Sequence, residues 1–373
     1  MRSSESVLNQ IEVEKSGLVG RIRRLHGILG GRYPFISRIA LALYDPETDL
    51  LKTFASSNVG TQNLMRYEAH LANVPSLQTL RDERKPRTVD DIHETFQAPS
   101  PHTEWLKSQS FRSSYTLPIY RGTELAAFMF FDSVEPQAFS PLVTEVLDDF
   151  ADIITQLYLL RLSAVNHLIG AVDIVTGLAR IRDVETGYHL ERMAKYSRLI
   201  ARRVAEHYLL SDEIVEYIHL FAPLHDIGKV GIPDAILLKP DKLDAEEWRQ
   251  MQQHVQIGED LVEQIVSDIG LENDPAAAVM RHVVAGHHER GDGSGYPRGL
   301  KFPDIPVASC IVAVADVYDA LSSSRPYKAP WTEPQCEAEL RTLVARGLLE
   351  PHCVEALLKD PEGRQTIKQR YPD

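Results

Sequence analysis

Two adjacent histidines open the stretch from His287 to Pro297, which reads HHERGDGSGYP. A glutamate, an aspartate and three glycines follow before the stretch closes at Tyr296 and Pro297. Imidazole and carboxylate groups are ligands that first-row transition metals take from proteins, whereas glycine and proline favour turns. The stretch therefore has two interpretations: a polar surface turn after a helix, or a metal site beside a loop shaped for a substrate.

More side chains of this kind lie upstream. Glu185 and His189 are four residues apart, so on a helix they project from one face. His225 and Asp226 are adjacent and are followed by Lys229. An imidazole paired with a carboxylate suits first-row metals, and an aspartate can bridge two ions.

Two further residues are ambiguous when taken alone. His254 lies in an amphipathic helical pattern, where an isolated histidine is typical of the edge of a core. Asp316 follows a nearly unbroken apolar run. A buried carboxylate without a partner is costly, so Asp316 requires a metal ion or a cation beside it, unless it caps a helix or forms a turn.

The elements that must position these side chains lie in the second half of the chain. Eight of the fourteen histidines fall between His189 and His288. From residue 181 onward the apolar pattern is nearly all helical, with loops at 229–244 and 291–306. We therefore expect an all-α domain over residues 181–373.

The first part of the chain has a different pattern. After an N-terminal segment (residues 1–14), the stretch 38–56 predicts two strands around the turn DPETD. The stretch 113–133 predicts a second hairpin, and the residues between the hairpins are helical or loop-like. This order resembles a GAF domain, a small α+β sensor module, over residues 15–141. Such domains bind a small ligand or only dimerise, and the sequence identifies no ligand.

A long helix is predicted to connect the two domains over residues 142–180. Its apolar residues recur in heptads: Val143, Val146, Phe150, Ile153, Leu157, Leu160, Ala164, Ala171 and Ile174. This pattern predicts a parallel coiled coil with a second copy of the chain, and hence a homodimer. The alternative is a single helix packed on its own domain.

Composition excludes several classes of function. The chain has 373 residues and a formal net charge of -13, which does not suit nucleic acid polymers, because their phosphates require a basic surface. No apolar run is long enough to insert into a membrane, and the N-terminus lacks a signal-peptide core, so we expect a cytoplasmic protein. The three cysteines show no CxxC spacing, which favours reduced structural thiols.

Taken together, the motifs resemble the HD-GYP family, a branch of the HD metal-dependent phosphohydrolases. The HD pair is His225-Asp226 and the GYP triplet is Gly295-Tyr296-Pro297. The resemblance extends from about Glu185 to Trp331, through HDIGKVGIPDAILLKP, HHERGDGSGYPRGL and ADVYDALSSSRPYK. It implies an all-helical domain that hydrolyses cyclic di-GMP, a bacterial second messenger, to pGpG and then to GMP, with a metal-bridging hydroxide as the nucleophile.

The same resemblance implies roles for individual residues. The expected metal ligands are Glu185, His189, His225, Asp226, His254, His287, His288 and Asp316. They would hold two or three divalent ions, iron or manganese, with Asp226 as the bridge and as a catalytic residue. Lys229 is expected to act in catalysis and, with Tyr296, Arg325 and Lys328, to bind the substrate. Asp292 is expected to brace the loop.

Two positions depart from the family pattern. Gly291 stands where the family often has a bulky aromatic residue, and Cys310 stands where an arginine is common. These departures concern substrate affinity and preference. Two other functions stay open: a protein that senses cyclic di-GMP without cleaving it, and a hydrolase of another nucleotide such as cyclic GMP-AMP or a guanosine polyphosphate.

Overall fold

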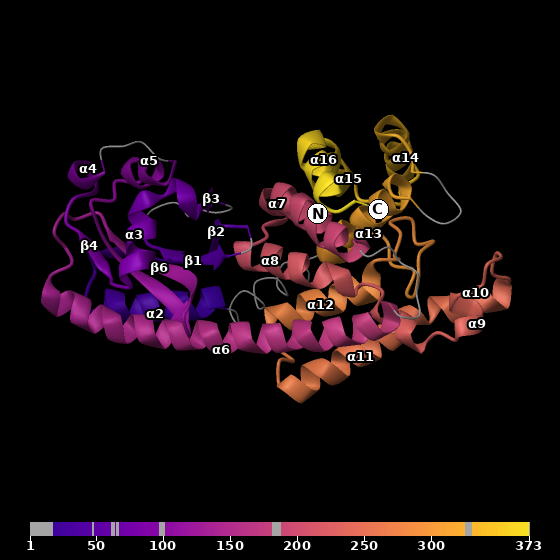
Figure 1. Ribbon diagram of the computed structural model, residues 1–373, viewed down its shortest axis with the longest axis horizontal. Coiled ribbons are helices and arrows are strands. Elements are labelled where there is room, and N and C mark those ends of the chain that lie inside the picture. The colour runs from indigo at the N-terminus through magenta and orange to yellow at the C-terminus, as the bar shows by residue number, and fades with distance from the viewer. Residues whose placement is uncertain are drawn as a thin grey trace. The chain divides into compact units, whose positions relative to one another are not determined.

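The computed structural model describes residues 18–46, 48–60, 64, 67–96, 101–180, 188–324 and 330–372. Its contacts divide the chain into two compact units (Figure 1). The first unit ends at Ser163 and also includes Ser211–Glu213, and the second begins at Ala164. Each unit has its own hydrophobic core.

A six-stranded antiparallel sheet, in the order β3-β2-β1-β6-β5-β4, forms the centre of the first unit. The two predicted hairpins are confirmed: they are β1 (Ile36–Asp45) with β2 (Leu50–Asn58), and β5 (Ser113–Arg121) with β6 (Glu124–Ser133). The edge strands β3 (Glu68–His70) and β4 (Arg87–Val89) were not predicted. Three residues are too few to show the alternation by which a strand is recognised.

Helices cover the sheet of this unit. They are α2 (Leu18–Gly30), η1 (Leu71–Asn73), α3 (Pro75–Glu83), α4 (Ile92–Thr95) and α5 (Pro101–Ser108). Side chains alternate along a strand, so Ile39 and Leu41 of β1 face one core together with Ile22 of α2. The opposite face of β1 carries Ala40, which belongs to a second cluster. The first unit therefore has the α+β organisation expected of a GAF-like domain.

The connecting helix is present as α6 (Pro141–Arg180). One face of its first half packs into the core of the first unit, through Leu147, Ala151, Ile154 and Tyr158.

The heptad residues of α6 differ in how far they are buried in their own unit. Val143 and Phe150 are partly buried against the core of the first unit, and their place in a dimer seam stays a prediction. Ile153 and Leu160 are 49% and 68% exposed, and because they are seven residues apart they form an apolar stripe on one exposed side of the helix. The side chains of Ala164, Ala171 and Ile174 lie outside the described part.

The second unit is helical, as predicted. Its elements are α7 (His189–Tyr208), α8 (Asp212–Phe221), η2 (Ala222–Leu224), η3 (Ile227–Gly231), α9 (Asp234–Leu237), α10 (Ala245–Gln252), α11 (His254–Ile269), α12 (Pro275–Gly286), α13 (Val307–Ser322), α14 (Glu333–Ala345), α15 (Pro351–Leu358) and α16 (Pro361–Arg370). Helices α7 and α13 cross in the core, where the rings of Tyr196 and Tyr318 meet edge to face at 5.0 Å. None of the helices in the described residues is long and apolar enough to span a membrane.

Backbone contact between η3 and α11 sets the position of the HD pair. A Cβ atom added to Gly228 would lie 1.8 Å from the carbonyl oxygen of His254 and 2.5 Å from the amide nitrogen of Gly258. Only glycine allows this approach. The contact holds Asp226, two residues before Gly228, close to the first turn of α11, which begins at His254.

We predict that Gly228→Ala lowers the stability of the second unit by about 3 kcal/mol or more, because two backbones would have to separate. Thermal unfolding measures the effect. Gly231→Ala is the matched control in the same 3-10 helix, since its new methyl group would meet only the flexible side chain of Ile257. Equal melting temperatures for the two variants would contradict the close backbone contact.

Candidate metal centre

Seven of the eight predicted metal ligands gather in two neighbouring groups. The first group is Asp226, His254, His287 and His288, and the second is His189, His225 and Asp316. Within each group, the candidate ligand atoms all lie within 4.8 Å of one another. The eighth predicted ligand, Glu185, lies outside the described residues, as do the predicted phosphate-binding residues Arg325 and Lys328.

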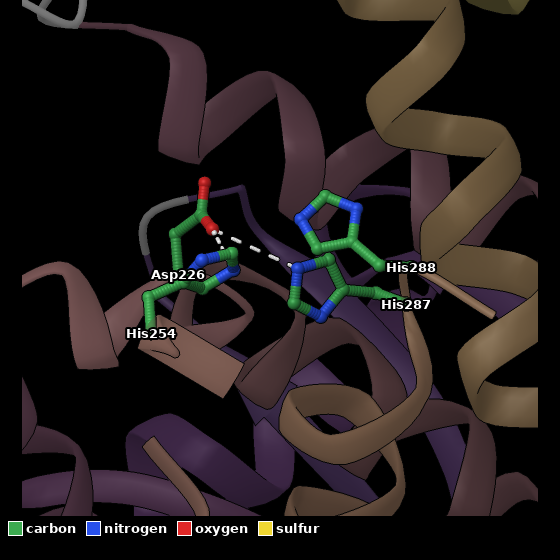
Figure 2. A group of neighbouring side chains, drawn as sticks. All are labelled: Asp226, His254, His287 and His288. Atoms are coloured by element: carbon green, nitrogen blue, oxygen red, sulfur yellow. Dashed lines mark ion pairs between the residues drawn. The ribbon is translucent and has the colours of Figure 1, made fainter. Parts of the chain in front are cut away.

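Asp226 connects the two groups. Its Oδ1 lies 3.2 Å from Nε2 of His254 and 3.6 Å from Nε2 of His287 (Figure 2). Its Oδ2 lies 3.2 Å from Nε2 of His225, which belongs to the other group. The carboxylate of Asp226 is therefore placed as a bridging ligand would be. Lys229, which is predicted to act on the phosphate, has its Nζ 3.0 Å from the same Oδ2.

A hydrogen bond at Nδ1 of each ring determines that the other nitrogen, Nε2, faces the centre. The Nδ1 atoms of His225, His254 and His287 meet the backbone carbonyls of Ala222, Met251 and Val284 at 2.9, 2.7 and 3.1 Å. A carbonyl oxygen only accepts, so Nδ1 carries the proton and donates it. In the neutral ring, Nε2 then has a lone pair available for a metal ion.

Burial and neighbouring side chains favour the metal-binding forms of His287, His288 and Asp226. Burial lowers the pKa of His287 and of His288, so both rings are neutral near pH 7. Burial alone would raise the pKa of Asp226, but Lys229 and His225 outweigh that effect and hold it well below its usual range. Lone pairs of neutral imidazoles thus face an ionised carboxylate.

Two acceptors that face each other need a cation between them. Nε2 of His254, Nε2 of His287 and Oδ1 of Asp226 are buried, and within the described residues none of the three atoms has a hydrogen-bond partner of acceptable geometry. Leaving such atoms unsatisfied is costly. Nitrogen and oxygen donors without sulfur suit a first-row divalent metal ion, so the residues present fit the group that the sequence implies.

The loop after His288 is braced by Glu289, which was not predicted to have a role. Its buried carboxylate accepts hydrogen bonds from the backbone amides of Arg298 and Leu300, both at 2.8 Å. Asp292, the expected brace, accepts from the amide of Ser294 and pairs with Lys301 in an isolated β-bridge across the loop. The position of Glu289 directly after the two histidines is the sequence feature that could have indicated this role.

Two positions in this loop require glycine because neighbouring atoms leave no room for a Cβ atom, and not because the backbone has a positive φ. A Cβ atom on Gly295 would lie 2.3 Å from the amide nitrogen of Arg290, because the loop folds back on the segment after His288. The ring of Phe302 occupies the space beside Gly291, where it would lie 1.9 Å from an added Cβ. Among the three loop glycines before Tyr296, only Gly293 has a positive φ, of 87°.

Aromatic side chains line the side of the centre next to this loop. The ring of Tyr296 stacks on His288 at a centroid distance of 4.6 Å. Trp248 of α10, which the sequence did not single out, lies 6.3 Å from Tyr296 in an edge-to-face arrangement and is 48% exposed. An aromatic pair of this kind offers ring faces to a planar base.

A buried ion pair behind His189 was also missed. Asp319 accepts from Nε of Arg192 at 2.6 Å and lies 2.7 Å from Nδ1 of His189. Burial raises the pKa of Asp319, but the hydrogen bonds from His189 and Arg192 reverse that effect, so the pKa is lowered. The signal was present in the spacing, because Arg192 and Asp319 each follow a predicted ligand by three residues.

Solved structures similar to this chain include two with GAF domains. The GAF domain/HD domain protein from Geobacter sulfurreducens is 14% identical, with a TM-score of 0.31, over 38% of this chain and 92% of that chain. The phycocyanobilin-bound GAF domain from a cyanobacterial phytochrome is 17% identical, with a TM-score of 0.29, over 40% of this chain and 93% of that chain.

Curated relatives are more similar. The cyclic di-GMP phosphodiesterase of Thermotoga maritima is 43% identical over 56% of this chain and 53% of its own length. The cyclic di-GMP phosphodiesterase response regulator RpfG of Xanthomonas campestris is 45% identical over 50% of this chain and 46% of its own length. The 3'3'-cGAMP-specific phosphodiesterase 2 of Vibrio cholerae is 42% identical over 52% of this chain and 34% of its own length.

The chain therefore spans about half, or less, of the length of these relatives. The match to a protein family is confined to residues 185–346, which fit the HD domain. This segment contains both groups of candidate ligands. Residues 185–346 thus match the HD domain, and the unit that precedes them in the sequence has the α+β organisation expected of a GAF-like domain.

Proposed function

We propose that the chain is a metal-dependent phosphodiesterase that hydrolyses cyclic di-GMP. One observation carries the proposal: three imidazoles, each held at Nδ1 by a backbone carbonyl, direct Nε2 toward a single carboxylate, that of Asp226. Such a centre suits divalent ions, and iron or manganese is the expectation for this ligand set. When bound, the ions supply Lewis acidity and activate water near neutral pH.

The side chains of this chain have separate tasks in the proposed reaction. Asp226 would hold both ions, since its two oxygens face different groups of candidate ligands. The ammonium of Lys229, which is partly exposed and adjacent to Asp226, stabilises negative charge on the phosphate as the phosphodiester bond breaks. Tyr296 lines the substrate side, and Arg325 and Lys328 are proposed to bind phosphate, with the guanidinium able to chelate two oxygens.

The proposed substrate is cyclic di-GMP, because relatives 43% and 45% identical carry that activity in their names. Cyclic GMP-AMP is the second candidate, since a relative 42% identical is named for it. Both substrates have two phosphodiester bonds in a ring and differ in one base. A cytoplasmic location, expected from the sequence, fits either substrate.

Asp226→Asn is expected to reduce hydrolysis of cyclic di-GMP at least about a hundred-fold and to lower the bound metal. The amide keeps the shape of the side chain but loses the charge that bridges the ions. Product chromatography and elemental analysis of metal-loaded protein measure the two effects. Asp241→Asn, in an exposed loop of the same domain, is the matched control.

Retention of full metal content and turnover by Asp226→Asn would refute the site. The same assay compares the two substrates: we expect a higher kcat/KM for cyclic di-GMP than for cyclic GMP-AMP. The reverse order would assign the second substrate. Binding of cyclic di-GMP by the metal-loaded protein without any product would instead indicate a sensor.

We further propose that Glu185 completes the coordination of a third ion beside His189, and that this ion supports cleavage of the linear product pGpG to GMP. The linear product has a terminal phosphate, whose extra charge needs another cation. Glu185→Ala is then expected to lose about one metal ion per chain, to keep cleaving cyclic di-GMP and to accumulate pGpG. An unchanged ratio of pGpG to GMP, with two ions in the wild type, would show that Glu185 is not a ligand.

The exposed stripe on α6 supports a homodimer, through which the GAF-like domain would regulate the HD domain. Ile153 and Leu160 are apolar and exposed, as expected of residues that a second copy covers. Leu160→Glu is expected to convert dimers to monomers, as measured by light scattering. Gln156→Glu, at an exposed polar position of the same helix, adds the same charge as a control. Dimers of unchanged stability in Leu160→Glu would exclude this interface.

A further inference from the structure

The most deeply buried charges near the metal centre belong to residues that are not predicted ligands. Arg192 of α7 and Asp319 of α13 are each 1% exposed. Nε of Arg192 donates to Oδ1 of Asp319 at 2.6 Å, and Nη2 donates to Oδ2 at 3.1 Å. The pair is therefore bidentate, which fixes the plane of the carboxylate.

The fixed carboxylate meets a predicted metal ligand. Oδ2 of Asp319 lies 2.7 Å from Nδ1 of His189, which is itself only 4% exposed. Two further contacts hold the pair from the side: Nη1 of Arg192 donates to the carbonyl of Tyr371 at 3.2 Å, and the hydroxyl of Ser323 donates to Oδ1 of Asp319 at 3.3 Å. The orientation of the His189 ring thus depends on Asp319 directly, and on Arg192, Tyr371 and Ser323 through their contacts with the pair.

His189 differs in this respect from the other histidines of the centre. The Nδ1 atoms of His225, His254 and His287 are held by carbonyl groups three residues earlier in their own segments. His189 is the first residue of α7, and its Nδ1 is held by a carboxylate from another helix. The same helix, α13, supplies Asp316, three residues before Asp319, to the group that contains His189.

A buried ion pair alone is a poor way to stabilise a fold, because desolvation offsets most of the attraction. A carboxylate that accepts from the outer nitrogen of a metal-binding imidazole has a better-defined effect, since it fixes the tautomer and strengthens the inner nitrogen as a ligand. The i,i+3 spacing on both helices places each member of the pair beside a ligand. These facts favour a role for the pair at the metal centre.

We propose that Asp319, held in place by Arg192, is a positioning residue that keeps the proton of His189 on Nδ1 and directs Nε2 to the ion of the second group. The proposal rests on the proposed metal centre. It predicts that the two groups differ: the ion held by His189, His225 and Asp316 depends on Asp319, and the ion held by His254, His287 and His288 does not.

The test compares wild-type protein with Asp319→Asn after loading with Mn²⁺ and desalting. An amide can donate to Nδ1 and so favour the wrong tautomer. We expect Asp319→Asn to lose about one ion per chain, with an affinity for that ion reduced about 10–100-fold. In the electron paramagnetic resonance spectrum, the signal of the coupled Mn²⁺ pair that Asp226 would bridge should be lost. Glu333→Gln is the control, because it changes the Arg364 ion pair of the same unit in the same chemical way.

A second variant separates positioning from folding. Asp319→Asn leaves the charge of Arg192 buried without its partner, which can destabilise the unit. The double variant Arg192→Met/Asp319→Asn removes both charges, and its melting temperature without metal shows whether the unit is folded. A folded double variant that lacks one ion supports the proposal.

Other outcomes would overturn the inference. A coupled Mn²⁺ pair in Asp319→Asn or in the folded double variant, with wild-type affinity, would refute the role of Asp319 and leave the proposed function intact. A wild-type protein that binds no metal ion would refute the proposed function and this inference together. A loss of one ion in Glu333→Gln as well would show that the effect is general destabilisation.

Discussion

The candidate metal centre is organised around one constraint: the carboxylate of Asp226, whose pKa is held well below its usual range, faces the Nε2 atoms of several imidazoles. Asp226 lies 3.2 Å from Nε2 of His225 and 3.2 Å from Nε2 of His254. Backbone carbonyls fix the protons at the far side of these rings. Facing lone pairs repel one another, so the arrangement is stable only when cations lie among them.

Two kinds of contact position these side chains: hydrogen bonds to the Nδ1 atoms of the rings, and packing or hydrogen bonds that fix the backbone segments carrying them. The contact of Gly228 with α11 brings the HD pair against His254. The buried carboxylate of Glu289 ties the loop after His288 to the amides of Arg298 and Leu300. Rigid support of this kind matters because a metal centre that is misplaced by a fraction of an ångström loses affinity. The histidines thus come from separate segments, yet their ligand atoms converge.

Much of the fold and of the candidate metal centre could be predicted from the sequence, because these features depend on patterns of neighbouring residues. The hairpins of the first unit follow from alternation around polar turns, and the helical second half follows from its apolar period. The candidate metal ligands were indicated by residue type and by resemblance, since residues such as His225-Asp226 and His287-His288 are adjacent in the chain. The predicted ligands that the structure describes lie together in two groups.

The sequence could not show what depends on contacts between distant segments. Arg192 and Asp319 are 127 residues apart, and each looks like an ordinary charge on a helix. The space beside Gly291 is filled by Phe302, so the missing side chain is replaced by a ring from another part of the loop. On α6, a heptad pattern could not distinguish Phe150, which packs into its own domain, from Leu160, which is exposed.

Anomalous diffraction from crystals of the HD domain grown with Mn²⁺ tests the central claim most directly. Two strong peaks are expected in contact with the carboxylate of Asp226, and the third ion proposed beside His189 would give a further peak. One should be coordinated by Nε2 of His254 and Nε2 of His287, and the other by Nε2 of His225 together with His189 and Asp316. Crystals without a peak between Asp226 and these imidazoles, or with Nε2 of His254 protonated and hydrogen-bonded to Asp226, would contradict the account.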